Sequence, residues 1–237
     1  MTNQNLFKQA FRLKESNCTI ISDKESAIEK AISSIKHHRR QLEEYIQKHP
    51  QFLHSLEPVP VDDGPKVARL MAEASAKAAV GPMAAVAGVL ADLAVEEMLG
   101  DGCKVAVVEN GGEVSAVSDQ PVDIALAAGD APLSREMGFR LKNFPIGVAT
   151  SSGLYSHAFS FGDAEAVTVF AVDAAVADAS ATAVANLIKG DDVQGVIRQG
   201  IDRALSIDGV QGVFILYRET VGKAGQVPEL IKVNPQK

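Results

Sequence analysis

GVATSSGLYSHAFSFGDAEAVTVFAVDAAVADASATAVANLIK, residues 147–189, is the stretch that decides the fold. Its first apolar run leads into a cluster of hydroxyl side chains closed by a glycine: Thr150, Ser151, Ser152 and Gly153. A second run, at 166–172, has the β-branched and aromatic content of a buried strand. The pattern predicts two strands joined by a polar loop at the centre of the molecule.

The segment after the second strand is almost wholly Ala and Val, and it predicts a helix over about 174–189. Asp178, Thr182 and Asn186 are spaced four apart, so they lie along one stripe of that helix. Burying such groups without partners costs roughly 1–3 kcal/mol each. The stripe therefore needs a partner, which is either the protein's own backbone or a cation with an anionic ligand.

The composition bounds the class of protein. With 237 residues, 22% charged and 46% hydrophobic, the chain resembles an ordinary soluble globular protein with room for a large core. A net charge of −7 leaves no basic surplus for phosphates, so no nucleic-acid partner is expected. The Ala-rich stretches near 78–99 and 164–188 carry interior charges and Gly or Pro breaks, so no membrane span is expected either.

The cysteines and the N-terminus indicate the compartment. Cys18 and Cys103 form neither a CxxC motif nor a cluster with zinc-ligand spacing, so two reduced thiols are expected. The start MTNQNLFKQAF lacks the basic end and apolar core of a secretory signal. The expected localisation is cytoplasmic.

The first 100 residues predict a hairpin and three helices. The hairpin spans 8–22 and turns at 15–17, and an amphipathic helix over about 24–48 ends before Pro50. Lys36 to Arg40 form a basic face on this helix, either solvated or a docking surface. An extended linker from Phe52 to Gly64 precedes helices over 65–79 and from Gly81-Pro82 to about Leu99.

The rest of the chain predicts strands in runs and helices in pairs. Strands are expected at 104–109, 113–117, 122–127, 138–141, 147–149, 166–172, 213–217 and 230–233, and helices at 174–189 and 192–205, the latter capped by Asp191. This order predicts an α+β fold with a largely antiparallel sheet, in a single domain over 1–237 whose core is 65–233. An internal pseudo-repeat and a homo-oligomer are compatible with the pattern.

Three further clusters carry possible chemistry, each with a structural alternative. Asn110-Gly111-Gly112 allows close backbone approach to a ligand or forms a hairpin turn. The hydroxyls at 150–152, with Tyr155 and His157 after them, cradle an anion or form a polar loop. GPMAAVAGVLAD at 81–92 presents a helix N-terminus to a ligand or packs closely against another helix.

Asp178 with Thr182 one turn on can form half of a Mg²⁺ site, because Mg²⁺ prefers oxygen ligands and usually keeps waters and substrate phosphates. The alternative is that both groups bond to neighbouring loops.

The order of these clusters resembles the ApbE superfamily of flavin transferases. VENGG (108–112), GVATSSGLY (147–155) and ADASATA (177–183) are similar to the family's N-x-G-G, A-T-S-G-x-Y and A-D-A-x-x-T-A motifs. The strand Val167-Thr168-Val169 precedes the last motif, and GPMAAVAGVLAD matches the family's helix with G-x-x-x-D at Gly88 and Asp92. The resemblance covers roughly 80–190.

The resemblance implies an ApbE-like α+β fold with a ligand site between the helix pairs and the sheet. Mg²⁺ would be bound by Asp178 and Thr182, and FAD or another nucleotide would be bound near Asn110 to Gly112 and at 150–157. In the family, the metal helps to cleave the FAD pyrophosphate so that FMN is transferred to a protein hydroxyl. The implied partners are a small phosphorylated ligand or a target protein.

The chain departs from the family's pattern at several points, among them an inserted Ser in the A-T-S-G motif. The family's A-K-G becomes Val86-Ala87-Gly88, so the lysine is missing, and the H-x-x-D-P-x-T-G stretch is absent. The whole pattern, from RLKESN to VGPMAAVAG, ENGG and ADA-x-AT, looks like an uncharacterised branch of the superfamily that has been linked to sulfide assimilation into homocysteine in anaerobes. The alternatives to a Mg²⁺-assisted transferase are therefore a non-catalytic assembly protein or a sulfur-assimilation factor.

Overall fold

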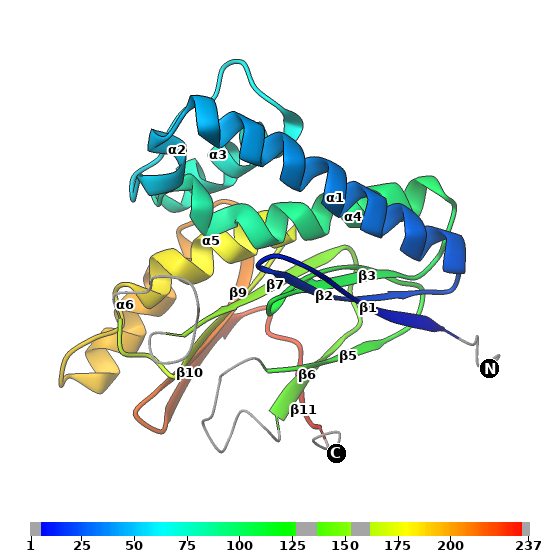
Figure 1. The fold of residues 1–237 in the computed structure, drawn as a ribbon. Helices are drawn as coiled ribbons and strands as arrows, with labels where there is room; N and C mark the ends of the chain where they lie inside the picture. The colour runs from blue at the N-terminus through cyan, green and yellow to red at the C-terminus, as the bar shows by residue number, and fades with distance from the viewer. Residues whose placement is uncertain (1–5, 127–136, 153–161, 234–237) are drawn as a thin grey trace.

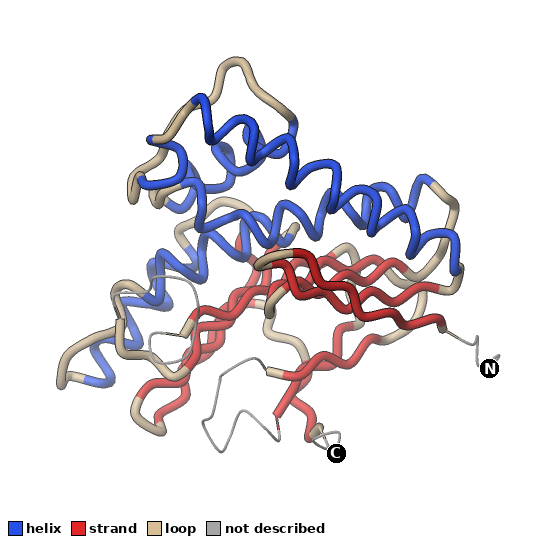
Figure 2. The backbone as a smooth tube through the Cα atoms, in the orientation of Figure 1, coloured by secondary structure: helices blue, strands red, loops and turns tan. Residues whose placement is uncertain are grey.

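The computed structural model describes residues 6–126, 137–152 and 162–233. Figures 1 and 2 show three layers: helices on one face of a large sheet and a small sheet on its other face. The expected α+β fold is confirmed, with helices and antiparallel sheets in separate layers. The strands are β1 (Phe7–Leu13), β2 (Ser16–Ser22), β3 (Ala106–Asn110), β4 (Glu113–Val117), β5 (Val122–Ala125), β6 (Met137–Leu141), β7 (Ile146–Ser151), β8 (Ala166–Ala171), β9 (Val210–Tyr217), β10 (Thr220–Gly225) and β11 (Glu229–Lys232).

The described helices form the layer that covers one face of the large sheet. They are α1 (Glu25–Lys48), α2 (Gln51–His54), α3 (Lys66–Ala78), α4 (Val86–Gly100), α5 (Ala174–Ala185) and α6 (Val193–Leu205), with the 3₁₀ turn η1 (Pro82–Ala85) leading into α4. Pro82 is the first residue of η1. Because N–H groups in the first turn of a helix have no helical acceptor, proline loses no hydrogen bond there.

The large sheet has the order β1-β2-β3-β4-β7-β8-β9-β10, and the small one β11-β6-β5. Neighbouring strands are antiparallel throughout the described pairs. In the register, Cys18 lies opposite Asn110, Val114 opposite Val148, and Ser151 opposite Val167. The β3–β4 turn, the end of β7 and the start of β8 therefore lie at one end of the large sheet.

Alternation along the central strands divides the core between two faces. Val167 and Val169 of β8 pack towards α5 and α6, whereas Phe170 packs between the two sheets. There its ring centroid is 4.9 Å from that of Phe139 of β6. The period of two assigns each residue near the sheet's end to either the helix side or the side of the small sheet.

Several boundaries differ from those predicted. The linker after Pro50 contains the short helix α2, in which Phe52 is fully buried and anchors the segment. Strand β10 was not predicted, because Val221 is its one large apolar residue and the others are Thr, Gly, Lys and Ala. Helix α6 is capped by Asp192, which accepts from the N–H of Gly195 at 3.0 Å, and not by Asp191.

Two residues of the basic face of α1, Lys36 and Arg39, contact the β1–β2 hairpin. Lys36 lies over the ring of Phe11, with its Nζ 5.5 Å from the ring centroid. Arg39 donates to Ser16 at 2.8 Å and pairs with Glu15, so it holds the β1–β2 hairpin. The hairpin itself turns at residues 14–15, one residue earlier than expected.

None of the individual described helices is long and apolar enough to cross a membrane, while the bent pair Lys66–Ala78 and Pro82–Gly100 meets the length and composition test only when taken together.

Candidate functional site

Helices α4 and α5 cap each other. Asp92 of α4 accepts from the backbone N–H groups of Ala174 and Ala175 at the start of α5, at 3.0 and 2.8 Å. In return, Asp178 of α5 accepts from the N–H of Gly88 at the start of α4, at 3.0 Å. Both carboxylates satisfy N–H groups that the first turn of a helix leaves without helical partners. The reciprocal contacts fix the position of Asp178 relative to α4.

The close crossing of the two helices requires a glycine. A Cβ added at Gly88 would lie 2.2 Å from the carbonyl oxygen of Ala174. In the G-x-x-x-D motif, Gly88 is therefore the point at which α4 crosses α5. Asp92, one turn later on α4, caps the start of α5. Residues 81–92 therefore pack closely against α5, which was the structural alternative considered for this segment.

Asp178 is a half-buried carboxyl group on a helix whose buried residues are mostly Ala and Val. Burial raises the pKa of Asp178 to about 7, while the N–H groups of Gly88 and Ala87 lower it and the nearby Asp92 carboxyl raises it. Burial therefore disfavours the ionised form of this carboxyl group in the protein alone. A divalent cation beside it would favour the ionised form.

Thr182 lies one helical turn beyond Asp178 and is half-buried. Asn186, the third member of the predicted stripe, is the C-cap of α5, and its N–H bonds to the carbonyl of Thr182 at 3.1 Å. Among the described residues, no group of three or more His, Cys, Asp or Glu side chains could hold a metal. A cation at Asp178 and Thr182 would need hydroxyl, water or substrate oxygens, which is a ligand set that Mg²⁺ accepts.

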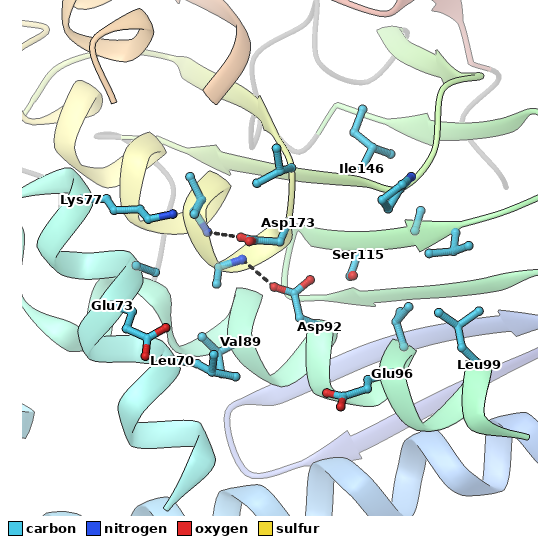
Figure 3. A pocket seen from close by; sticks show the side chains of 18 residues that line it. Leu70, Glu73, Lys77, Val89, Asp92, Glu96, Leu99, Ser115, Ile146 and Asp173 are labelled. Carbon is cyan, nitrogen blue, oxygen red and sulfur yellow. Dashed lines mark hydrogen bonds between the residues drawn. The ribbon is translucent and has the colours of Figure 1, made fainter. Parts of the chain in front are cut away.

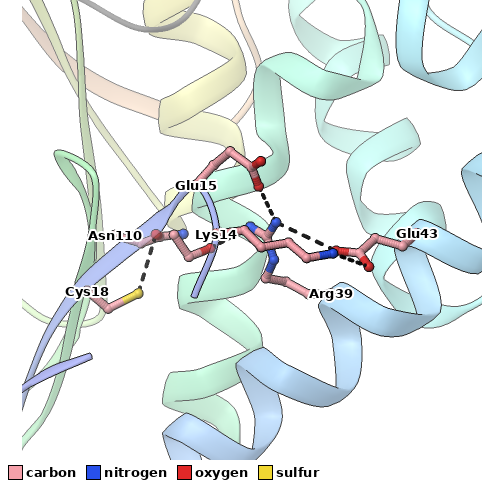
Figure 4. A network of polar contacts seen from close by, with 7 residues as sticks. Lys14, Glu15, Cys18, Arg39, Glu43 and Asn110 are labelled. Atoms are coloured by element: carbon pink, nitrogen blue, oxygen red, sulfur yellow. Dashed lines mark hydrogen bonds and ion pairs between the residues drawn. The ribbon is translucent and has the colours of Figure 1, made fainter. Parts of the chain in front are cut away.

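Asn110 ties the sheet to the start of α4. Its side chain is 3% exposed, and its Oδ1 accepts from the thiol of Cys18 at 3.4 Å. Its Nδ2 donates to the carbonyl of Ala87 at 3.2 Å. Figure 4 shows Asn110 and Cys18 beside the cluster of Lys14, Glu15, Arg39 and Glu43. The amide thus places β3 next to the residues that bind Asp178.

Gly111 and Gly112 form the β3–β4 turn with φ of 74° and 119°, in the region that favours glycine. The N–H of Gly111 donates to the carbonyl of Asn17 at 3.0 Å, and the N–H of Gly112 donates to Glu109 at 2.8 Å. A ligand at this turn would contact the backbone surface, or displace the Glu109 carboxylate.

The hydroxyl cluster at the end of β7 divides between the two faces of the large sheet. Thr150 bonds to Thr168 at 2.9 Å between their Oγ1 atoms, and with Gly112 they line a cavity of about 330 Å³ between the two sheets. Ser151 and Ser152 are both buried. Of the other predicted ligand residues, Gly153, Tyr155 and His157 lie outside the described residues.

A second cavity, of about 350 Å³, lies at the start of α5 and contains none of the predicted site residues. Figure 3 shows Asp92 and Asp173 beside it, each bonded to the first turn of α5. Ser115 of β4 also bonds to Asp92 and lines this cavity.

Two polar residues of β4, Glu113 and Ser115, were missed by the sequence analysis. Glu113 directly follows the paired glycines and shares a strand face with Ser115. A carboxylate immediately after a glycine turn and two residues before a serine was the available signal.

Both thiols are buried in the described structure and neither forms a disulfide. Burial raises the pKa of Cys18 to about 11. Burial also raises the pKa of Cys103, whose thiol donates to the carbonyl of Met98 at 3.2 Å. Neither environment favours the thiolate that a sulfur carrier needs.

Comparison with known proteins agrees with this architecture. A family model described as "AbpE bacteria" matches residues 2–208. A UPF0280 protein of Methanocaldococcus jannaschii is 41% identical over 96% of this chain and 94% of its own length. A UPF0280 protein of Methanococcus vannielii is 39% identical over the same shares of both chains.

Solved structures with this fold include two ApbE proteins. The apo flavinyl transferase ApbE of Pseudomonas stutzeri has a TM-score of 0.57 and 16% identity over 95% of this chain and 96% of that one. The ApbE protein of Thermotoga maritima has a TM-score of 0.59 and 12% identity over 93% and 97%. At these identities the likeness is one of fold.

The mutually capped helices on an antiparallel sheet, the matching family model and the full-length relatives agree, and the chain therefore belongs to the ApbE-like family described as "AbpE bacteria", together with the UPF0280 proteins.

Proposed function

We propose that this protein is a Mg²⁺-assisted enzyme that binds a phosphorylated, nucleotide-like ligand of the flavin type. The observation that carries the proposal is the placement of Asp178, a buried carboxylate one turn from Thr182, beside the start of α4. A buried carboxyl with a pKa near 7 gains most from a cation, because the cation replaces the lost hydration.

Each residue has a role that follows from its contacts. Asp178 would bind the metal through its carboxylate, which also accepts from the N–H of Gly88, and Thr182 would supply its hydroxyl. Asp92 holds the start of α5, and so positions both. When bound, Mg²⁺ supplies a positive charge that offsets charge developing on phosphate oxygens.

The ligand would bridge the end of the large sheet. On the helix side of the sheet, Asp178 would hold the metal and, through it, the phosphates of the ligand. On the other side, Thr150, Thr168 and Gly112 line the cavity between the two sheets. A cavity of about 330 Å³ lies within the range of small-ligand pockets and suits one ring system. A ligand with an anionic and an organic part fits both surfaces.

Ala87 limits the chemistry that we propose. It occupies the family's lysine position, and its carbonyl bonds to Asn110 while Gly88 bonds to Asp178. Without that lysine, the metal is the cationic group available beside the phosphates. We therefore propose metal-assisted chemistry at a phosphate and do not assign FMN transfer.

Thermal unfolding with and without ligand tests the proposal. FAD with Mg²⁺ is expected to stabilise the protein by about 2.7 kcal/mol at a concentration of 100 times Kd. This corresponds to a rise in Tm of about 5 °C or more for a chain of this size. Asp178→Asn, which retains an acceptor for Gly88, should lose the Mg²⁺-dependent part, whereas Asp163→Asn, at an exposed carboxylate, should retain it. An equal shift in Asp178→Asn, or no shift with FAD, ADP or FMN, would contradict the proposal.

A second candidate function is a non-catalytic binding or assembly protein. It is favoured by the polar groups of the glycine turn, since Asn110, Gly111 and Gly112 all bond within the chain. Recovery of one stable protein partner by the wild type, together with no nucleotide-dependent rise in Tm, would support this alternative.

A further inference from the structure

Strand β4 carries a second carboxylate on the helix side of the sheet. Ser115 of β4 bonds to Asp92 of α4, so its face of the strand meets the helices. Val114 instead packs between the sheets with Phe139 and Phe170. Because successive side chains point to opposite faces, Glu113 shares the helix-facing side with Ser115. β4 thus presents one polar group to Asp92 and another towards the start of α4.

Strand β4 lies against both α4 and α5, so Glu113, at the start of β4, faces the layer that holds Asp178. After burial, the charge of Asp178 is the largest cause that raises the pKa of Glu113 well above its usual range. The negative charge of Glu109 also raises the pKa of Glu113. Two carboxyl groups that repel each other in a water-poor layer are stabilised by a cation that lies between them.

A buried hydroxyl without a partner lies at the same end of the sheet. Ser151 is 6% exposed, and its Oγ makes no hydrogen bond to any of the residues that the structure describes. In β7, Ala149 packs with the helix-side core and Val148 between the sheets, so Ser151, two residues after Ala149, faces the helices. Extending the pairing of Val114 with Val148 places Ser151 beside the turn that precedes Glu113.

Burying a hydroxyl group without a hydrogen bond lowers the stability of the fold by roughly 1–3 kcal/mol, and a ligand that bonds to the hydroxyl removes this cost. The Ser151 hydroxyl is an observation independent of the two carboxyl groups, and it indicates a ligand on the same side of the sheet.

We propose that Glu113 is a third protein ligand of the divalent cation, joining Asp178 and Thr182, and that the Ser151 hydroxyl contacts the anion that the cation carries. This inference rests on the proposed function. Two carboxylates, one hydroxyl and phosphate or water oxygens form a ligand set suited to Mg²⁺, and the two negative charges match one divalent ion. Glu113 is thereby a metal ligand, and not a residue that serves only the hairpin.

Titration with Mn²⁺, followed by the EPR signal of the free ion, tests this assignment on the full chain without any nucleotide. The wild type is expected to bind one Mn²⁺ per chain. Glu113→Gln should weaken binding by 10-fold or more, and Asp178→Asn at least as much. Glu165→Gln is the matched control, because this carboxylate bonds to the N–H of Arg218 next to β8 and should bind Mn²⁺ as the wild type does.

Folding of the variant is measured alongside. Glu113→Gln removes a buried like charge, so without metal its Tm at pH 8 should equal or exceed that of the wild type, while Mn²⁺ should raise the wild-type Tm more. A lower metal-free Tm in Glu113→Gln with unchanged Mn²⁺ affinity would show a structural role and overturn the inference. Failure of the wild type to bind Mn²⁺ would contradict the proposed function itself, whereas equal binding by wild type and Glu113→Gln contradicts this inference alone.

Discussion

Gly88→Ala is expected to lower the free energy of unfolding by about 3 kcal/mol or more. The added Cβ would lie 2.2 Å from the carbonyl oxygen and 2.5 Å from the carbonyl carbon of Ala174. These are backbone atoms at the start of α5, so no side-chain rotation relieves the contact. The helices must separate, which also lengthens the hydrogen bond from the N–H of residue 88 to Asp178. Urea unfolding followed by circular dichroism measures the loss.

Gly100→Ala in the same helix is the matched control. No atom lies within 4 Å of a Cβ added at Gly100. Alanine there should leave stability unchanged, or raise it by up to about 1 kcal/mol, because alanine restricts the unfolded chain and favours the helix. Equal stability of Gly88→Ala and Gly100→Ala would mean that α4 and α5 do not cross at Gly88.

Asp92→Ala should have the second largest effect, a loss of roughly 3 kcal/mol in the free energy of unfolding. The substitution leaves the buried N–H groups of Ala174 and Ala175 without their acceptor. It also removes a negative charge from the positive end of α5. Because α5 carries Asp178 and Thr182, metal-dependent ligand binding should weaken together with stability. Urea unfolding gives the first quantity, and the FAD-dependent change in Tm gives the second.

Asp92→Asn separates the acceptor from the charge. Burial raises the pKa of Asp92 to about 6, so the folded wild type holds a proton that the unfolded chain releases near pH 4. The resulting stability is fully present below about pH 4 and is lost as the pH rises through about 6. Asn keeps one acceptor and removes this titration, so its stability should fall less than that of the wild type between pH 4 and pH 7. Parallel pH profiles for the two proteins would contradict the assignment.

The sequence predicted the elements with strong periodic patterns. Helix α1, predicted from its Ile and Leu spacing, and the apolar strand β8 lie close to their expected bounds. The Ala-rich helix α5 begins at Ala174 as expected, but it ends at Ala185, about one turn before the predicted residue 189. The sequence did not predict that β5, β6 and β11 form a separate sheet. That division depends on side-chain packing between sheets, chiefly of Phe139 on Phe170, and local strand propensity carries no information about it.

The candidate site was predicted as a set of clusters, but not as a geometry. The four-residue spacing placed Asp178 and Thr182 on one face of a helix, and the structure keeps both on α5. The contact of Asp178 with Gly88 joins residues 90 positions apart, and no local pattern reveals it. The same holds for Glu113, whose pKa the charge of Asp178 raises because β4 lies against the two helices.

Anomalous diffraction from crystals grown with Mn²⁺ and ADP tests the central claim most directly. The account predicts one anomalous peak beside Asp178 and Thr182, within about 2.2 Å of a carboxylate oxygen and the hydroxyl, with phosphate oxygens on its open side. A Mn²⁺ peak bound elsewhere, or bound ADP with no metal at these two side chains, would contradict it.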